Sequence, residues 1–549
     1  MSDYYDLGSY GRAITTRSTE AQLWFNRGLV WCYAYHHDES VACFRRVLES
    51  DPDCAMAYWG IAYASGCNYN KPWEHFDPED LRRSVATAYD ATREAMGRMN
   101  VATSFEKALI GALAHRYPAR EPAEDMASWN DGYADAMRKV AAAFRDDLDV
   151  ATLFGESIMN RTPWALWDLE TGKIAEGADT AEAIEVLDKA LTLDGALQHP
   201  GLLHIYIHLM EMSPHPQRAL KACDALRSLA PDAGHLNHMP THIDVLCGDY
   251  ERVVSSNTAA IIADRKFLEQ EGPLNFYSLY RSHNYHFKIY GAMFLGQYHP
   301  AIETADEMIS TLPEELLKVE SPPMADWLEG FISMKQHVYI RFGKWQEIID
   351  QPLPENQELY CVTTAMMRYS RAVALAASGD VAAAEQESRR FDEAVARVPD
   401  SRYVFNNTCL DILAVAREMM LGEVDYRKKE YDAAFAHLRK SVELDDNLPY
   451  DEPWGWMQPT RHALGALLLE QDRLQEAAEV YRADLGLDQT LSRACQHPDN
   501  VWSLHGYHEC LMRLGRNEEA NIIKARLDIA NGRTDVPVKS SCFCKLGSH

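Results

Sequence analysis

The sequence predicts an all-α protein, a right-handed superhelical solenoid of antiparallel helix pairs. Along most of the chain, apolar residues recur at i, i+3, i+4 and i+7, which is the spacing of an amphipathic helix. Breaks rich in Gly, Asp and Pro separate these stretches. Sustained alternation of β-branched residues, which would indicate strands, is absent. A rhythm of short helices and short breaks indicates a repeat architecture.

Composition excludes several classes of function. The chain has 549 residues, is 47% hydrophobic and carries 54 basic against 82 acidic residues, a net charge of −28. This much apolar surface opposes disorder, and the negative charge opposes binding to nucleic acid or to anionic membranes. No apolar run approaches the roughly 18–20 residues that span a bilayer. The polar start lacks an apolar signal region, so we expect a cytoplasmic protein.

The first helix pair shows the repeat most clearly. Trp24, Gly28, Trp31, Phe44 and Pro52 stand at the characteristic offsets of the 34-residue tetratricopeptide pattern. Small residues in this pattern let the two helices of a pair cross closely, and large residues fill the groove between neighbouring pairs. The proline begins the next pair. The N-terminal region is therefore predicted to be tetratricopeptide-like.

Further segments are typical of the turn between the two helices of a pair. They are 248–254, 296–302, 343–349, 378–384, 471–477 and 515–521. Loop insertions are expected at 66–80, 116–129 and 448–459. We therefore expect a continuous array over 20–531, preceded by an N-terminal segment at 1–19 and followed by a flexible tail at 532–549.

The histidines cluster in the middle of the array, over 199–290. Nine of the 21 histidines lie between His199 and His286. His204 and His208 are four residues apart, on one face of a helix. His238 and His242 repeat this spacing 34 residues later, which is one repeat. The phase match indicates that equivalent helices present equivalent imidazoles.

The following repeat extends the pattern. Aligning the turn glycines of the two repeats maps His235 onto His283 and His238 onto His286. Pro240 bends or starts a helix and therefore weakens the register of this mapping. Because the first helices of tetratricopeptide pairs line the concave face, these imidazoles are expected to point to a shared focus there.

Imidazoles four residues apart on a helix can bind one metal ion. Several neutral imidazoles suit Zn, Cu, Fe or Ni. The predicted metal ligands are His204, His208, His238 and His242. The predicted catalytic helpers are His235, His283, His286 and Glu211. Neither pair is an HExxH motif, so a standard zinc protease is excluded, and no nucleotide-binding or nucleophile-elbow motif is present.

These features favour a metal-binding, catalytic site that acts on a small molecule. The alternative is an interaction scaffold that binds a peptide or partner helix in the concave groove without catalysis. A third possibility is a structural solenoid that uses histidine only for packing. Cys542 and Cys544 form the only CxC pair, which fits a metal or redox site or a disordered end.

Longer segments resemble the tetratricopeptide repeat protein 38 family and its bacterial and fungal relatives. The similarity is carried by 24–62, 199–220, 231–250 and 283–287, and it extends to about residue 530. The resemblance implies an all-helical solenoid with a histidine-bearing middle, without implying a settled reaction. The positions that look like motif residues of that family are His37, His204, His208, His238 and His242.

Overall fold

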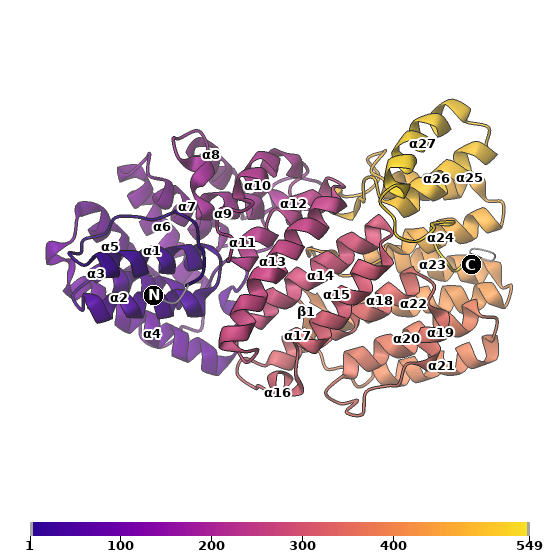
Figure 1. Cartoon of the computed structure of the whole chain (residues 1–549), viewed down its shortest axis with the longest axis horizontal. Coiled ribbons are helices and arrows are strands. Elements are labelled where there is room, and N and C mark those ends of the chain that lie inside the picture. The colour runs from indigo at the N-terminus through magenta and orange to yellow at the C-terminus, as the bar shows by residue number, and fades with distance from the viewer. Residues whose placement is uncertain (1–3, 546–549) are drawn as a thin grey trace. The chain divides into compact units, whose positions relative to one another are not determined.

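The computed structural model describes residues 4–545. This part of the chain folds almost entirely into helices, labelled α1 to α27 in Figure 1, with one short hairpin of β1 (Tyr403–Val404) and β2 (Asn407–Thr408). The prediction of an all-α repeat protein is confirmed. Among the described residues, no helix has both the length and the apolar character needed to cross a membrane.

The chain forms two compact units, where the sequence predicted one continuous array. The first unit comprises Met1–Ile243 and Ala259–Gln270. The second unit comprises Asp244–Thr258 and Glu271–His549. Each unit is built from consecutive helices, many of them joined by short connections that make neighbours antiparallel.

In the first unit, five helix pairs follow one another. They are α1 (Thr19–Tyr33) with α2 (His37–Ser50), α3 (Ala55–Ala64) with α4 (Pro78–Gly97), α5 (Ser104–Arg116) with α6 (Ala127–Ala143), α7 (Leu148–Met159) with α8 (Thr180–Ala190), and α9 (Pro200–Glu211) with α10 (Leu220–Leu226). Next come α11 (Gly234–His238) and then α12 (Thr241–Leu246) and α13 (Tyr250–Glu271), whose residues are divided between the two units.

The second unit contains the pair α14 (Ser278–Leu295) and α15 (Tyr298–Ser310). Four short helices follow: α16 (Glu314–Leu317), α17 (Met324–Ile332), α18 (Met334–Arg341) and α19 (Trp345–Asp350). Regular pairs then resume as α20 (Cys361–Ala377) with α21 (Val381–Val395), α22 (Cys409–Arg427) with α23 (Tyr431–Asp446), α24 (Thr460–Glu470) with α25 (Leu474–Asp484), and α26 (Val501–Arg513) with α27 (Asn517–Asn531).

The turns inside the pairs fall where the sequence predicts them. Five of them place a glycine in the left-handed region, at Gly248, Gly296, Gly343, Gly379 and Gly515. A glycine lacks the Cβ that makes this conformation costly, so it ends one helix and lets the next begin two residues later. The loops predicted around 66–80 and 448–459 are also present, before α4 and α24.

Phe44 explains the packing of the first repeats. Its ring is fully buried, and it lies between Gly28 of α1 and Gly60 of α3. A Cβ added to Gly28 or Gly60 would stand 2.8 or 2.6 Å from the ring. The two glycines therefore let three consecutive helices close on one aromatic side chain, as the tetratricopeptide pattern predicts.

The N-terminal segment is fastened to the first unit. Arg12 forms ion pairs with Asp147 at 2.7 Å and Asp149 at 2.5 Å, and its guanidinium lies 3.6 Å from the centre of the Phe105 ring. The Asp149 carboxylate also accepts a hydrogen bond from the Tyr10 hydroxyl at 2.7 Å. Residues before α1 thereby join α5 and α7.

The C-terminal segment, for which the sequence predicts a flexible tail, lies against helices of the second unit. Ser540 and Ser541 are buried. The Ser541 hydroxyl is 2.5 Å from that of Tyr481, and its carbonyl accepts a hydrogen bond from Arg341. Cys542 and Cys544 are joined by a disulfide. Residues 532–545 contain no helix or strand, and Ser540, Ser541 and Cys544 are the buried residues among them. Residues 546–549 lie outside the described residues.

Candidate metal centre

Helix α9 places three polar side chains inside the first unit. His199 caps the helix, because its Nδ1 accepts a hydrogen bond from the Leu202 amide at 3.0 Å, and a proline follows at the first helical position. Every residue of α9 is buried. His204, His208 and Glu211 are therefore held in the interior, at positions four and three residues apart on one helix face.

Five imidazoles form a closed circuit in the first unit. The distance between ring centres is 4.8 Å for His204 and His208, 5.8 Å for His208 and His242, and 4.8 Å for His242 and His238. The circuit closes with 5.6 Å between His238 and His235 and 4.9 Å between His235 and His204. Each of the five is at most 2% exposed. Two consecutive repeats thus bring their histidines together, as the spacing in the sequence predicts.

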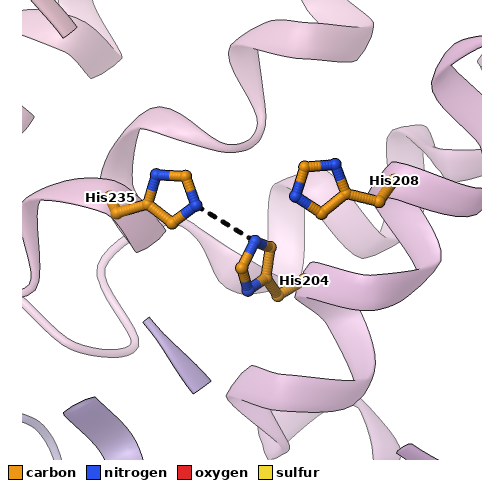
Figure 2. A group of neighbouring side chains, drawn as sticks. All are labelled: His204, His208 and His235. Carbon is orange, nitrogen blue, oxygen red and sulfur yellow. Dashed lines mark hydrogen bonds between the residues drawn. The ribbon is translucent and has the colours of Figure 1, made fainter. Parts of the chain in front are cut away.

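Three of these imidazoles form a candidate metal-binding group. One ring nitrogen from each of His204, His208 and His235 lies within 4.8 Å of the other two. Figure 2 shows their rings converging from α9 and α11, with His204 Nε2 3.2 Å from His235 Nε2. Two nitrogens bound to one tetrahedral zinc ion are about 3.3 Å apart. The His204–His235 spacing matches that value.

The Nδ1 atoms of His204 and His208 contact groups that fix the tautomers of these two rings. His204 Nδ1 lies 2.6 Å from the carbonyl oxygen of Tyr33, which can only accept, so Nδ1 carries the hydrogen. His208 Nδ1 lies 2.7 Å from Glu211 Oε1. The Nε2 lone pairs of the neutral rings are therefore available for a metal ion. His208 Nε2 is buried without a hydrogen-bond partner.

Glu211 connects the two histidine pairs. Its Oε1 accepts from His208 Nδ1, and its Oε2 accepts a short hydrogen bond from His242 Nδ1. The carboxylate is 1% exposed, and in the described part of the chain only histidines pair with it. A carboxylate behind a metal-binding imidazole orients the ring and raises its basicity. Glu211, predicted as a catalytic helper, stands in this supporting position.

Burial sets the protonation states of these groups. It lowers the pKa of His208 to about 3, and it lowers the pKa of His204 well below its ordinary value, with help from the neighbouring His208. Both rings are therefore neutral near pH 7, as metal binding requires. Burial also raises the pKa of the Glu211 carboxyl well above its ordinary value. A cation among the imidazoles would offset that cost and favour the carboxylate.

His238 and His242 form a second, hydrogen-bonded pair. Pro240 separates α11 from α12, so the two histidines do not share one continuous helix as His204 and His208 do. Their Nε2 atoms nevertheless lie 2.8 Å apart. Since two lone pairs would repel at this distance, one of the two nitrogens carries a hydrogen or both face a cation.

Aromatic rings surround the histidines. The Tyr35 ring centre lies 4.5 Å from that of His204, 5.9 Å from that of His208 and 5.8 Å from that of His235. Tyr69 packs against His208 at 5.0 Å. These rings give the group a surrounding of low polarity, which strengthens electrostatic interactions within it.

Tyr35 is a site residue that sequence reasoning missed. Its φ is +54°, a left-handed conformation that is unusual for a bulky residue. It occupies the turn position between α1 and α2, where later pairs use glycines such as Gly296. A tyrosine at a position that favours glycine was the signal in the sequence. The strained backbone conformation of Tyr35 thus coincides with contacts between its ring and three imidazoles.

The remaining predicted residues, His283 and His286, lie on α14 in the second unit. The His283 ring packs against Phe405 at 4.4 Å between ring centres. His286 Nε2 lies 2.7 Å from Met457 Sδ, and its ring packs against Phe331. Their roles as catalytic helpers stay predictions.

Comparisons with known proteins add little beyond the fold. No family model matches the chain, and a search of curated proteins found no match. Among solved structures, the APC/C hetero-tetramer Cut9–Hcn1 has a similar chain with 14% identity, covering 87% of this chain and 76% of that one, at a TM-score of 0.31. An IFIT1 monomeric mutant is similar with 13% identity, covering 82% of this chain and 86% of that one, at a TM-score of 0.32. The P58(IPK) TPR domain is similar with 15% identity, covering 83% of this chain and 99% of that one, at a TM-score of 0.20.

TM-scores this low carry no argument about function. The class of the protein instead rests on its own helix pairs, on the glycine turns between them and on the packing around Phe44. These features define a tetratricopeptide-like α-helical repeat protein whose first unit encloses a cluster of imidazoles.

Proposed function

We propose that this repeat protein binds a transition metal ion through His204, His208 and His235. The observation that carries the proposal is the convergence of three buried ring nitrogens within 4.8 Å of one another. Nδ1 of His204 and Nδ1 of His208 each contact a hydrogen-bond acceptor, which leaves the Nε2 lone pairs of both rings for the ion. Imidazole ligands of this kind suit Zn, Cu, Fe or Ni.

The bound ion would act on a small molecule. Three protein ligands leave a fourth position, where the ion can polarise a carbonyl group or lower the pKa of a water molecule. Because all three histidines are at most 2% exposed, an extended protein substrate has no direct access to them. The Nε2 atoms of the adjacent His238–His242 pair lie 2.8 Å apart, so this pair can hold or pass a proton beside the ion.

The resemblance to the tetratricopeptide repeat protein 38 family belongs to the same proposal. Its motif residues include four of the five imidazoles in the circuit, namely His204, His208, His238 and His242. We assign the protein to that type, with a cytoplasmic location.

Metal analysis tests the proposal. The full chain is purified without a histidine tag, and its metals are measured by inductively coupled plasma mass spectrometry. About one transition metal ion per chain is expected, lost in both His208→Ala and His235→Ala. His215→Ala is the matched control, because His215 is in the same unit but outside the circuit. Metal-free wild-type protein that also fails to take up added Zn, Cu, Fe or Ni would contradict the proposal and leave the alternative of a scaffold for a protein partner.

A further inference from the structure

A second buried polar group in the first unit surrounds Arg116. This residue ends α5 and is 1% exposed. Its guanidinium carbon lies 4.7 Å from the centre of the Tyr63 ring and 4.9 Å from the centre of the Tyr133 ring. Aromatic rings therefore surround the cation, and its N–H groups remain as hydrogen-bond donors.

The edges of the guanidinium are only partly used. Nη2 donates to the Cys67 carbonyl at 2.5 Å and contacts the Cys67 sulfur at 3.4 Å. Nε and Nη1 are buried without a hydrogen-bond partner. Leaving buried donors unsatisfied is costly, so native proteins rarely do so away from a ligand or an ordered water molecule.

The charge of Arg116 also lacks a contacting anion. Within the described part of the chain, no carboxylate forms an ion pair with Arg116. The nearest acidic influence is Glu156, whose carboxyl group accepts a short hydrogen bond from the Tyr63 hydroxyl. Burial raises the pKa of Glu156 above its ordinary value, against the opposing effects of Tyr63 and Arg116. Buried cations are normally paired, so Arg116 is a cation prepared for an anion.

A second unsatisfied donor lies beside Arg116. The Tyr117 hydroxyl is fully buried and has no hydrogen-bond partner. It sits so close to the loop before α4 that a Cβ on Gly66 would be 1.9 Å away. The next residue, Cys67, is the one whose carbonyl binds Arg116. The loop at 66–77, expected from the sequence only as an insertion, thus lines this group.

We infer that Arg116 and Tyr117 form a binding site for a small carboxylate. A carboxylate carries a single charge, and its oxygens accept hydrogen bonds from guanidinium N–H groups and from a phenolic hydroxyl. One arginine offsets one negative charge, so a phosphate dianion would leave an excess buried charge beside Glu156. Neither residue of this site belongs to the histidine circuit. The ligand class that we infer for the site is a small organic acid.

Acetate is the probe for this site. Its binding to the full chain at pH 7 and constant ionic strength is followed by saturation-transfer NMR of the methyl signal, with inorganic phosphate as competitor. We expect saturable acetate binding that phosphate does not displace at equal concentration. Arg116→Lys keeps a charge but loses the planar donor edge, so affinity should fall at least about 10-fold.

Tyr117→Phe is the decisive variant, because it removes only an unpartnered hydroxyl. A purely structural tyrosine would tolerate the change, whereas a ligand-binding one should lose about 10-fold in acetate affinity with unchanged circular dichroism. Tyr133→Phe is the matched control, since that ring also stacks on Arg116 but its hydroxyl is not among the buried unpartnered groups. Its affinity should stay within about twofold of wild type.

The titration is repeated after removal of metal with EDTA and in His208→Ala. Acetate binding that persists there supports the Arg116 site whether or not the histidines hold a metal ion. Binding lost under those conditions places acetate on the metal instead and overturns the assignment. The assignment would also be overturned by acetate binding that does not saturate or by phosphate that binds more tightly than acetate. Wild-type acetate affinity in Tyr117→Phe would overturn it as well.

Discussion

Glu211 accepts a hydrogen bond from Nδ1 of His208 at 2.7 Å, three residues before it on α9. The other oxygen of the same carboxylate accepts a hydrogen bond from Nδ1 of His242, which belongs to the next repeat. One buried carboxylate thus sets the tautomers of two imidazoles. Any metal affinity of the site therefore depends on a residue that need not touch the ion.

Glu211→Gln tests this dependence. The glutamine side chain has one accepting oxygen in place of two, so it no longer fixes both Nδ1 tautomers, and it removes the negative charge behind His208. We expect metal affinity to fall about 10- to 100-fold, measured by competition with a chromophoric chelator. Glu106→Gln is the control, because Glu106 is buried in the same unit and its carboxylate accepts hydrogen bonds from Thr15 and Thr103. Equal metal affinity in Glu211→Gln and wild type would refute the supporting role.

Asp149→Asn should destabilise the first unit. The carboxylate pairs with Arg12 and His199 and accepts hydrogen bonds from two tyrosines. Burial alone would raise its pKa, but these partners outweigh burial and hold it well below the ordinary value. Removing one partner of a buried pair costs about 3–5 kcal/mol in unfolding free energy. Asp147→Asn, at the more exposed end of the same arginine, should cost about 1 kcal/mol or less.

The pH dependence of this effect has a defined sign. Because the folded-state pKa of Asp149 is depressed, its contribution is present above the unfolded value near 3.8 and is lost as pH falls. Urea unfolding of wild type and Asp149→Asn at several pH values should therefore converge under acid conditions. A difference in unfolding free energy that grew below pH 4 would contradict the assignment.

Asp445 should show the opposite behaviour in the second unit. Burial, aided by neighbouring Asp446, raises the pKa of Asp445 to about 8. The folded state then binds a proton that the unfolded state has released, so stability is lost as pH rises from about 4 to 8. Asp445→Asn, which mimics the protonated acid, should be more stable than wild type by at least about 1 kcal/mol at pH 9. Urea unfolding should show this advantage disappearing near pH 4.

Gly28→Ala tests the close crossing of α1 over Phe44. The added Cβ would stand 2.8 Å from the ring, and overpacking of this kind costs about 1–3 kcal/mol. Gly111→Ala in α5 is the matched control, because its Cβ would meet nothing within 4 Å. That substitution should stabilise the protein by about 0.4–1 kcal/mol. Urea midpoints that moved in the same direction for both variants would argue against the packing role of Gly28.

The repeat fold was readable from the sequence because its determinants are local. Turn glycines, the Phe44–Gly28 spacing and the four-residue histidine pairs all act within one repeat or between neighbours, so periodicity alone predicts them. The 34-residue separation of His204 and His238 predicted that their helices would present imidazoles together, and the circuit in the first unit follows from it.

Contacts distant in sequence were decided only by the tertiary structure. Tyr35 contacts three imidazoles from a strained turn. Arg116 and Tyr117 contact Cys67 and Gly66 in a loop without a repeat pattern. Likewise, no periodicity marks Arg12 or Ser541 as groups that fasten the chain ends. The sequence alone determined which helices form and pair, since those choices depend on neighbouring residues. Which polar groups share one buried space depends on packing across many repeats, and a linear pattern does not contain that information.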